Sequence, residues 1–257
     1  MLIDTHAHLY MEHFDDDIDD VIQNAKKSNI KKIFLPNIDS STISKMLKLV
    51  KKDVDFFKPL IGLHPGSVNE NFKSELKIIR NELEIRKYYG IGEVGIDLYW
   101  DKTFEKEQIV AFDTQIKWAK EFNLPVIIHA RNAMDLTIDI IEKNLDKNLK
   151  GIFHCFTGNI DQAFRIMKTG FYLGIGGILT YKNSGLKDVI KEIPLEYLVL
   201  ETDSPYLPPV PFRGKRNESA YIKYIAKQLA ETKNISLDEI EKSTSENASK
   251  LFNLIPV

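Results

Sequence analysis

Six side chains of metal-binding type lie in short apolar segments that are far apart in the sequence. Two of them, His6 and His8, belong to the opening run of the chain, and the other four are Glu93, His129, His154 and Asp203. Apolar segments seldom end on such residues, because charged and imidazole groups are costly to bury unless they are paired or bound to a metal. Their recurrence predicts that the fold gathers ligands for a metal centre.

The spacing of His6 and His8 supports a shared ion. Residues i and i+2 of a strand point to the same face, so both imidazoles can reach one cation. The same parity puts Glu201 and Asp203 on one face, if their strand continues that far. A lone His-x-His is a weak signal, because packed core histidines show the same spacing.

The elements that must position these residues are visible as apolar segments of strand length. We predict strands near residues 2–5, 32–35, 57–63, 89–93, 125–129, 151–153, 171–175 and 197–201. They are continuous rather than alternating, which is typical of parallel strands buried on both faces. Helical stripes fill the gaps, starting at Ile18, Ile109 and Ile222, and residues 236–239 form a capping box.

Alternation of strands and helices indicates an α/β fold, and eight strands favour a (β/α)8 TIM-type barrel. We expect one domain over residues 1–257, because single barrels typically have ~250 residues. A doubly wound open sheet is the structural alternative, but no Gly-x-Gly-x-x-Gly follows the first strand. In a barrel the carboxyl ends of all strands meet at one face, where active sites lie. The six candidates would therefore converge.

Six ligands exceed what one ion needs, because a single site uses three or four protein ligands. They predict two ions with one bridging carboxylate. Glu93 is the natural bridge, because it lies between the two histidine sets in strand order. We then assign His6, His8 and Asp203 to one ion, and His129 and His154 to the other.

Composition limits the remaining function classes. The chain has 35 basic and 37 acidic side chains and a net charge of −2, so it does not bind nucleic acid through bulk charge. A phosphate-bearing substrate would be held by metal ions and a few local cations. No apolar run approaches the ~20 residues of a membrane span, and no secretory signal opens the chain. The single cysteine, Cys155, excludes an intrachain disulfide, so we expect a cytoplasmic protein.

These motifs together resemble the TatD family of metal-dependent deoxyribonucleases, within the amidohydrolase-like barrels. The resemblance covers nearly the whole chain in the family's order. It is carried by Asp4-Thr5-His6-Ala7-His8, Gly62-Leu63-His64-Pro65, Gly92-Glu93-Val94-Gly95-Ile96-Asp97, Pro125-Val126-Ile127-Ile128-His129-Ala130-Arg131, His154-Cys155-Phe156-Thr157-Gly158, Glu201-Thr202-Asp203-Ser204-Pro205-Tyr206-Leu207 and Pro211-Phe212-Arg213-Gly214-Lys215-Arg216-Asn217-Glu218.

The resemblance implies a TIM-type barrel, two divalent cations and hydrolysis of DNA phosphodiester bonds. By motif, the ligands correspond to the two sets assigned above, with Glu93 as the shared ligand. Relatives often carry a second histidine after the His-Pro pair, where this chain has Gly66. That departure concerns substrate contact at the end of the third strand and leaves the metal set untouched.

The size of the barrier reduction that an enzyme must supply indicates a mechanism. Enzymes lower barriers by ~8–23 kcal/mol, whereas a positioned general base contributes only about 10²–10⁴-fold. Metal chemistry must therefore carry most of the acceleration. Our hypothesis is attack by a metal-bound hydroxide, with Asp203 and the shared Glu93 as catalytic residues and Asp203 taking or holding the proton. Ligand softness favours Zn, Mn, Co or Ni over Mg, but the resemblance implies that Mg can also act.

Contacts to a nucleic-acid substrate are expected at the same rim. Arg131, Arg213, Lys215 and Arg216 are candidates for phosphate contacts, with a surface salt bridge as the alternative for each. His64, which ends the third strand, is expected to touch substrate or support the site rather than bind metal. Stacking of unpaired bases on rim aromatics would favour single-stranded DNA ends and exonucleolytic cleavage. Those aromatics are Tyr99, Trp100, Phe156, Tyr206 and Phe212, with ordinary packing as the alternative.

Two other functions remain open. The same barrel could hydrolyse a cyclic amide, ester or lactone, but many such relatives bridge their metals with a carboxylated lysine on strand four, where this chain offers Glu93. A non-catalytic binding module would not need such a complete ligand set. We expect neither a membrane nor an obligate protein partner. Cys155 is expected to be a buried structural thiol that points away from the site rather than a nucleophile.

Overall fold

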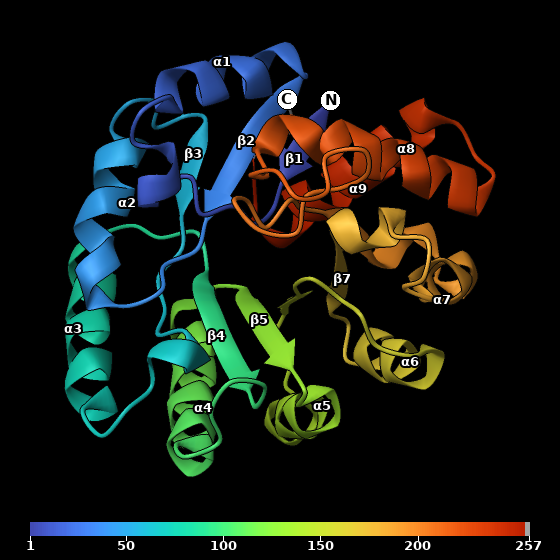
Figure 1. The fold of residues 1–257 in the computed structure, drawn as a ribbon. Helices are drawn as coiled ribbons and strands as arrows, with labels where there is room; N and C mark the ends of the chain where they lie inside the picture. Colours follow the sequence, from blue (N-terminus) through green and yellow to red (C-terminus); the bar gives the residue numbers. More distant parts are fainter. Residues whose placement is uncertain (255–257) are drawn as a thin grey trace.

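Strands and helices alternate along the chain in the computed structural model, which describes residues 1–254 (Figure 1). The strands are β1 (Leu2–Asp4), β2 (Ile30–Leu35), β3 (Phe57–Pro59), β4 (Ile91–Asp97), β5 (Val126–Arg131), β6 (Gly151–Phe153), β7 (Tyr172–Ile175) and β8 (Leu198–Leu200). The α-helices are α1 (Ile18–Lys27), α2 (Ile43–Val50), α3 (Phe72–Ile85), α4 (Glu105–Phe122), α5 (Met134–Asn144), α6 (Ile160–Lys168), α7 (Leu186–Glu192), α8 (Ile222–Lys233) and α9 (Leu237–Leu251).

Short 3-10 helices lie in the connections. They are η1 (Glu12–Phe14), η2 (Ser40–Thr42), η3 (Pro65–Ser67), η4 (Gly177–Thr180), η5 (Leu195–Tyr197) and η6 (Ser219–Tyr221). The helical stripes that begin at Ile18, Ile109 and Ile222 lie in α1, α4 and α8, as predicted. At the start of α9, the Ser236 side chain accepts a hydrogen bond from the Glu239 N–H, which is the N-cap bond of the predicted capping box.

All the strands run parallel, and each pairs with its neighbours in chain order. They form two hydrogen-bonded runs, β1-β2-β3 and β4-β5-β6-β7-β8. Single parallel bridges, Ala7 with Ser204 and Ile61 with Ile91, join the two runs at both seams. The ring is therefore closed, and the predicted TIM-type barrel is confirmed.

Several predicted strand boundaries were wrong, including the start of β2, which begins at Ile30 rather than at residue 32. We expected the third strand to run to residue 63, but β3 ends at Pro59, which has no N–H to donate to a ladder. Beyond β3, the backbone of Asn37, which follows β2, exchanges hydrogen bonds of 3.0 Å with Gly92 and Glu93. β4 and β5 extend past Glu93 and His129, to Asp97 and Arg131.

The barrel interior is a compact apolar cluster that takes one residue from most strands. The end of α9 packs on it, with the Phe252 ring stacked 3.7 Å from the Phe34 ring between centroids. The cluster consists of Ile3, Phe34, Leu60, Ile127, Ile152, Val199, Ala248, Leu251 and Phe252. A larger apolar layer fills the space between the strands and the outer helices. None of the helices in residues 1–254 combines the length and apolar character needed to cross a membrane.

Candidate metal centre

Strand parity brings the site residues to the carboxyl end of the barrel. Ile127 and Ile152 belong to the interior cluster, so the residues two positions later, His129 and His154, point to the same inner side. Val199 places Glu201 inward in the same way. In β5, β6 and β8 an apolar residue thus fills the barrel, and the polar residue two positions later faces its mouth.

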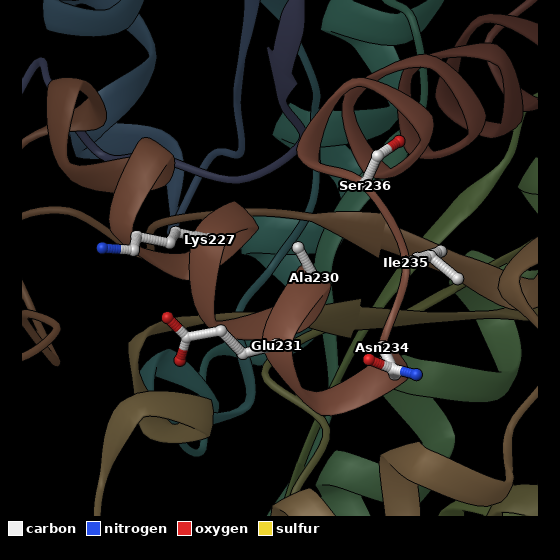
Figure 2. A pocket seen from close by; sticks show the side chains of 6 residues that line it. All are labelled: Lys227, Ala230, Glu231, Asn234, Ile235 and Ser236. Atoms are coloured by element: carbon white, nitrogen blue, oxygen red, sulfur yellow. The ribbon is translucent and has the colours of Figure 1, made fainter.

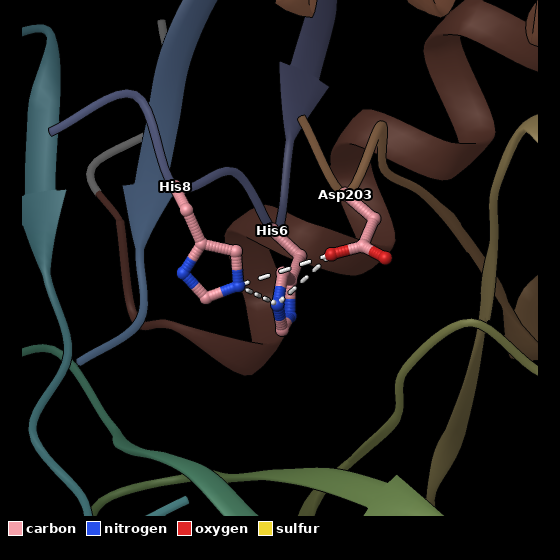
Figure 3. A group of neighbouring side chains, drawn as sticks. All are labelled: His6, His8 and Asp203. Carbon is pink, nitrogen blue, oxygen red and sulfur yellow. Dashed lines mark hydrogen bonds and ion pairs between the residues drawn. The ribbon is translucent and has the colours of Figure 1, made fainter. Parts of the chain in front are cut away.

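His6, His8 and Asp203 form one group of potential ligands, and their side chains point toward one another from the end of β1 and the loop after β8 (Figure 3). The Nε2 atoms of His6 and His8 are 3.1 Å apart. Asp203 Oδ1 lies 3.7 Å from His6 Nε2 and 3.8 Å from His8 Nε2. Asp203 adopts a φ of 58°, so the chain turns sharply there instead of continuing as strand.

Glu93 divides its two oxygens between two sets of imidazoles. Its Oε2 lies 3.2 Å from His6 Nε2 and 3.3 Å from His8 Nε2. Its Oε1 lies 2.8 Å from His129 Nδ1 and 3.0 Å from His154 Nε2. The carboxylate is therefore placed as a shared ligand must be. His154 also lies close to the first set, because its ring stacks on that of His6 with centroids 3.9 Å apart.

A hydrogen-bond chain determines the proton position on His8. The Tyr10 hydroxyl donates to the Pro36 carbonyl at 2.7 Å, so its oxygen accepts from His8 Nδ1 at 3.1 Å. With its proton on Nδ1, His8 turns the lone pair of Nε2 toward His6 and Glu93. This is the tautomer that a metal ligand needs.

Two carboxylates orient His129 and His154 in the same manner, and neither was assigned a role from the sequence. Asp97 Oδ2 lies 2.9 Å from His129 Nε2, which leaves Nδ1 to face Glu93. Glu201 Oε1 lies 3.2 Å from His154 Nδ1 and also accepts a 2.6 Å hydrogen bond from the Cys155 N–H. The signals were present, because Asp97 ends its strand and Glu201 is two residues before Asp203.

His64 carries its proton on the nitrogen that faces the site, unlike His8. Its Nδ1 accepts a 2.9 Å hydrogen bond from the Gly66 N–H, so a neutral His64 carries its proton on Nε2. That atom lies 3.5 Å from Glu93 Oε1. His64 therefore presents an N–H to the site, although it also belongs to a group of potential ligands with Glu93 and His129. A Cβ at Gly66 would come 3.0 Å from His64 Nδ1, so the glycine leaves room for this contact.

The imidazoles and carboxylates of the site shift one another's pKa values, and burial lowers the pKa of His6 well below its usual value. Burial alone would raise the pKa of Glu93, but the imidazoles of His154, His64 and His6 outweigh it and hold that pKa well below its usual value. Burial would lower the pKa of His154, yet Glu93 and Glu201 raise it well above its usual value. Burial raises the pKa of Asp203 to about 6. Carboxylates that stabilise a proton on an imidazole also stabilise a cation in its place.

These observations fit divalent cations. Imidazole nitrogens and carboxylate oxygens are common ligands of Zn and Mn, and the lone pairs of His8, His129 and His154 converge on Glu93. His6 Nδ1 and Glu201 Oε2 are buried and have no hydrogen-bond partner in residues 1–254. Such unpaired polar atoms are costly, but the His6 nitrogen that faces Glu93 and Asp203 is Nε2 rather than Nδ1.

The three predicted arginine contacts have different surroundings. Arg131 is exposed, with its guanidinium 3.8 Å from the centroid of the Tyr99 ring. Arg213 is exposed over the Tyr181 ring at 3.9 Å. Arg216 instead forms a two-pronged ion pair with Asp17 at 2.6 and 2.8 Å, so the salt-bridge alternative describes its contacts. Its role toward substrate remains a prediction.

The aromatic residues predicted at the rim fall into an exposed group and a packed group. Tyr99, Trp100 and Tyr206 are exposed, whereas Phe156 is buried and Phe212 stacks on Tyr221 with centroids 4.0 Å apart. Ordinary packing therefore describes Phe156 and Phe212.

Cys155 differs from expectation, because it is half-buried rather than buried. Burial and then the carboxylates of Asp203, Glu201 and Glu93 raise the pKa of its thiol well above the usual value, which disfavours a thiolate nucleophile. Its backbone has a φ of 46°, so the strand does not continue through it, and its N–H donates to Glu201 Oε1.

A separate hollow lies where α8 turns into α9 (Figure 2). It is lined by Lys227, Ala230, Glu231, Asn234, Ile235 and Ser236 and contains none of the predicted site residues.

Comparison with known proteins agrees with this geometry. Residues 3–253 match the family model described as TatD related DNase. The chain is 42% identical over 255 residues to the uncharacterized metal-dependent hydrolase YabD of Bacillus subtilis, covering 99% of this chain and 100% of YabD. Its structure resembles the crystal structure of YJJV, a TatD homolog from Escherichia coli, with a TM-score of 0.93, 31% identity and coverage of 99% and 98%.

A more distant likeness extends the fold comparison. The phosphotriesterase homology protein of Escherichia coli has a TM-score of 0.72 at 13% identity, with 98% of both chains covered. At this identity the likeness concerns the barrel alone. Taken with the family match and the two relatives, the chain belongs to the TatD-related DNase family of metal-dependent hydrolases.

Proposed function

We propose that this chain hydrolyses phosphodiester bonds of DNA, acting exonucleolytically on single-stranded ends. Two divalent cations, Mg, Mn or Zn, would be held by two ligand sets that share Glu93. The first set is His6, His8 and Asp203, and the second is His129 and His154. The observation that carries the proposal is the division of the Glu93 oxygens between four imidazoles at 2.8–3.3 Å.

The residues divide the chemistry among them. When bound, the cations would supply Lewis-acid activation of water and neutralise charge on the phosphate. Asp203 would accept the proton of the attacking water, because its carboxylate is the acidic group of the first ligand set. The Nε2–H of His64 would donate to a phosphate oxygen. The exposed guanidinium groups of Arg131 and Arg213 would hold the neighbouring phosphates.

Two features of the site support DNA as the substrate rather than a neutral cyclic amide, ester or lactone. The bridging position is a glutamate, whereas many barrels that cleave cyclic amides or lactones use a carboxylated lysine there. The rim also carries exposed cations at Arg131 and Arg213, which a neutral substrate does not require.

The decisive experiment uses end-labelled single-stranded DNA and Asp203→Asn. We expect the metal-loaded protein to release nucleotides from the end and the variant to lose turnover by at least about 10²-fold, the contribution of a general base. Circular dichroism should show an unchanged fold. Asp188→Asn, on the exposed face of α7, is the matched control and should retain full activity. Full activity of Asp203→Asn would refute its role, and cleavage of a lactone without cleavage of DNA would refute the proposed substrate.

A further inference from the structure

An exposed aromatic cluster lies beside the metal centre. Trp100 is 79% exposed and Tyr99 51% exposed. Their rings meet edge to face with centroids 4.8 Å apart and an interplanar angle of 89°. The Arg131 guanidinium lies 3.8 Å from the Tyr99 centroid and 5.4 Å from the Trp100 centroid. We call Tyr99, Trp100 and Arg131 the aromatic platform.

Folding does not account for the exposure of Trp100. A tryptophan can bury 150–250 Å² of surface, and leaving most of it in water forgoes that stabilisation. The Arg131 guanidinium lies over an aromatic ring and forms no ion pair with any of residues 1–254, so its charge remains available near the Trp100 ring. An aromatic face beside a cation matches a nucleobase with its phosphate.

A hydrogen bond connects the aromatic platform to a residue that contacts a candidate metal ligand. Asp97, whose carboxylate contacts His129, also accepts a 2.9 Å hydrogen bond from the Tyr99 N–H through Oδ1. Trp100 is three residues beyond Asp97, so their Cα atoms are at most about 11 Å apart. A base near the scissile phosphate can therefore reach the Trp100 ring.

The space beside the platform has the size of a small ligand. An open hollow of about 440 Å³ is lined by Leu98 and Ala130, the chain neighbours of Tyr99 and Arg131, and by residues of the loops after β5 and β6 and of the first turns of α5 and α6. Ligand sites typically measure ~300–1,000 Å³. The hollow continues the platform over the loops that follow His129 and His154.

We infer that the aromatic platform is a nucleobase subsite, in which Trp100 stacks on an unpaired base of the substrate strand and Arg131 binds its phosphate. This inference rests on the proposed function and specifies its substrate class. Bases inside a duplex are stacked on both faces, and the bases of a terminal pair are held by their pairing partners, so an unpaired base is the one that can turn freely onto Trp100. The platform therefore selects ends whose bases are unpaired.

Kinetics on two backbones test the subsite. The substrates are an oligothymidylate and the same backbone with abasic nucleotides at the cleaved end. Trp100→Ala should raise KM for the intact strand about 5- to 150-fold, the value of one stacked base, with kcat unchanged. Trp100→Phe should restore part of the loss. Phe164→Ala, which removes an exposed aromatic from the outer helix α6, is the matched control.

Non-additivity identifies the base as the partner of Trp100. The abasic end should raise KM of the wild type by a similar factor, and combining it with Trp100→Ala should add nothing further. Additive losses, or an unchanged KM in Trp100→Ala, would overturn the subsite. So would a change in oligomeric state without a change in KM, which would assign the cluster to a protein contact.

A fluorescence measurement separates the subsite from the nuclease activity. The chain has two tryptophans, and Trp118→Phe leaves Trp100 as the sole emitter. A slowly cleaved phosphorothioate oligothymidylate should quench it in the metal-loaded protein, and the abasic analogue should not. Equal quenching by both would overturn the subsite even if DNA is cleaved. Absence of all DNA cleavage by the wild type would overturn the proposed function, with base-selective quenching still supporting the subsite.

Discussion

At the scale of single residues, the hydrogen bond on one nitrogen of a histidine decides what the other nitrogen can do. Tyr10, Asp97 and Glu201 each occupy one nitrogen of a candidate ligand and leave the other facing Glu93. The Gly66 N–H does the reverse at His64. The hydrogen-bond partner on the far nitrogen therefore decides the role of each histidine. His8, His129 and His154 turn a lone pair toward Glu93, whereas His64 turns an N–H toward it.

Glu201 provides a test of this division. Glu201→Ala should lower the affinity for Zn or Mn about 10- to 100-fold, because His154 loses the group that orients its ring. Gly174→Ala should have a similar effect, since a Cβ there would come 2.3 Å from Glu201 Oε2. Calorimetric titration of the metal-free protein measures both. Glu201→Gln keeps an accepting oxygen and should retain more affinity. Wild-type affinity in Glu201→Ala would show that Glu201 does not position His154.

At the scale of elements, the loop after β8 carries Asp203 and must be held in place. The Asn217 side chain donates 2.7 Å hydrogen bonds to the carbonyls of Thr202 and Tyr206. Arg216 links the same loop to Asp17, the residue that precedes α1. Of the cationic residues predicted to contact phosphate, at least Arg216 therefore joins a loop to a helix.

Arg213 and Arg216 should accordingly behave differently. Arg213→Ala should raise KM for single-stranded DNA and reduce the slope of log affinity against log salt by about 0.7, the value for one phosphate contact. Arg216→Ala should leave that slope unchanged and lower the free energy of unfolding by a fraction of a kcal/mol, as expected for a surface ion pair. Kinetics at several salt concentrations and urea unfolding measure the two effects. Equal salt slopes for both variants would contradict this distinction.

At the scale of the whole molecule, the metal centre spans the two hydrogen-bonded runs of the barrel. His6 and His8 follow β1 of the first run, whereas Glu93, His129 and His154 belong to or follow strands of the second run. Each seam between the runs has a single β-bridge, which a few backbone hydrogen bonds reinforce, such as that from the Asp203 N–H to the His6 carbonyl at 2.9 Å. Cations bound to ligands from both runs would therefore join them at the mouth of the barrel.

Metal removal should consequently destabilise the fold. Free metal at 100 times its Kd stabilises the folded state by about 2.7 kcal/mol, which corresponds to about 5–10 °C in Tm for a chain of this size. Thermal unfolding with a chelator and with added Mn or Zn measures the difference. Glu93→Ala should lose most of the metal-dependent increment. A Tm of the wild type that is the same with and without metal would contradict coupling between the centre and the barrel.

The sequence by itself determined the order of the strands, the barrel class, the family and the identity of the residues that meet at the mouth. Those properties depend on local patterns, namely apolar strand segments, strand parity and short motifs. Each such pattern can be recognised within one segment of the sequence. Only the tertiary structure decided which nitrogen of each histidine faces Glu93, that Asp97 and Glu201 orient two of them, and that Arg216 is paired with Asp17. Each of these depends on hydrogen bonds between segments distant in the chain, such as the 47 residues that separate His154 from Glu201, and no local pattern encodes such distances.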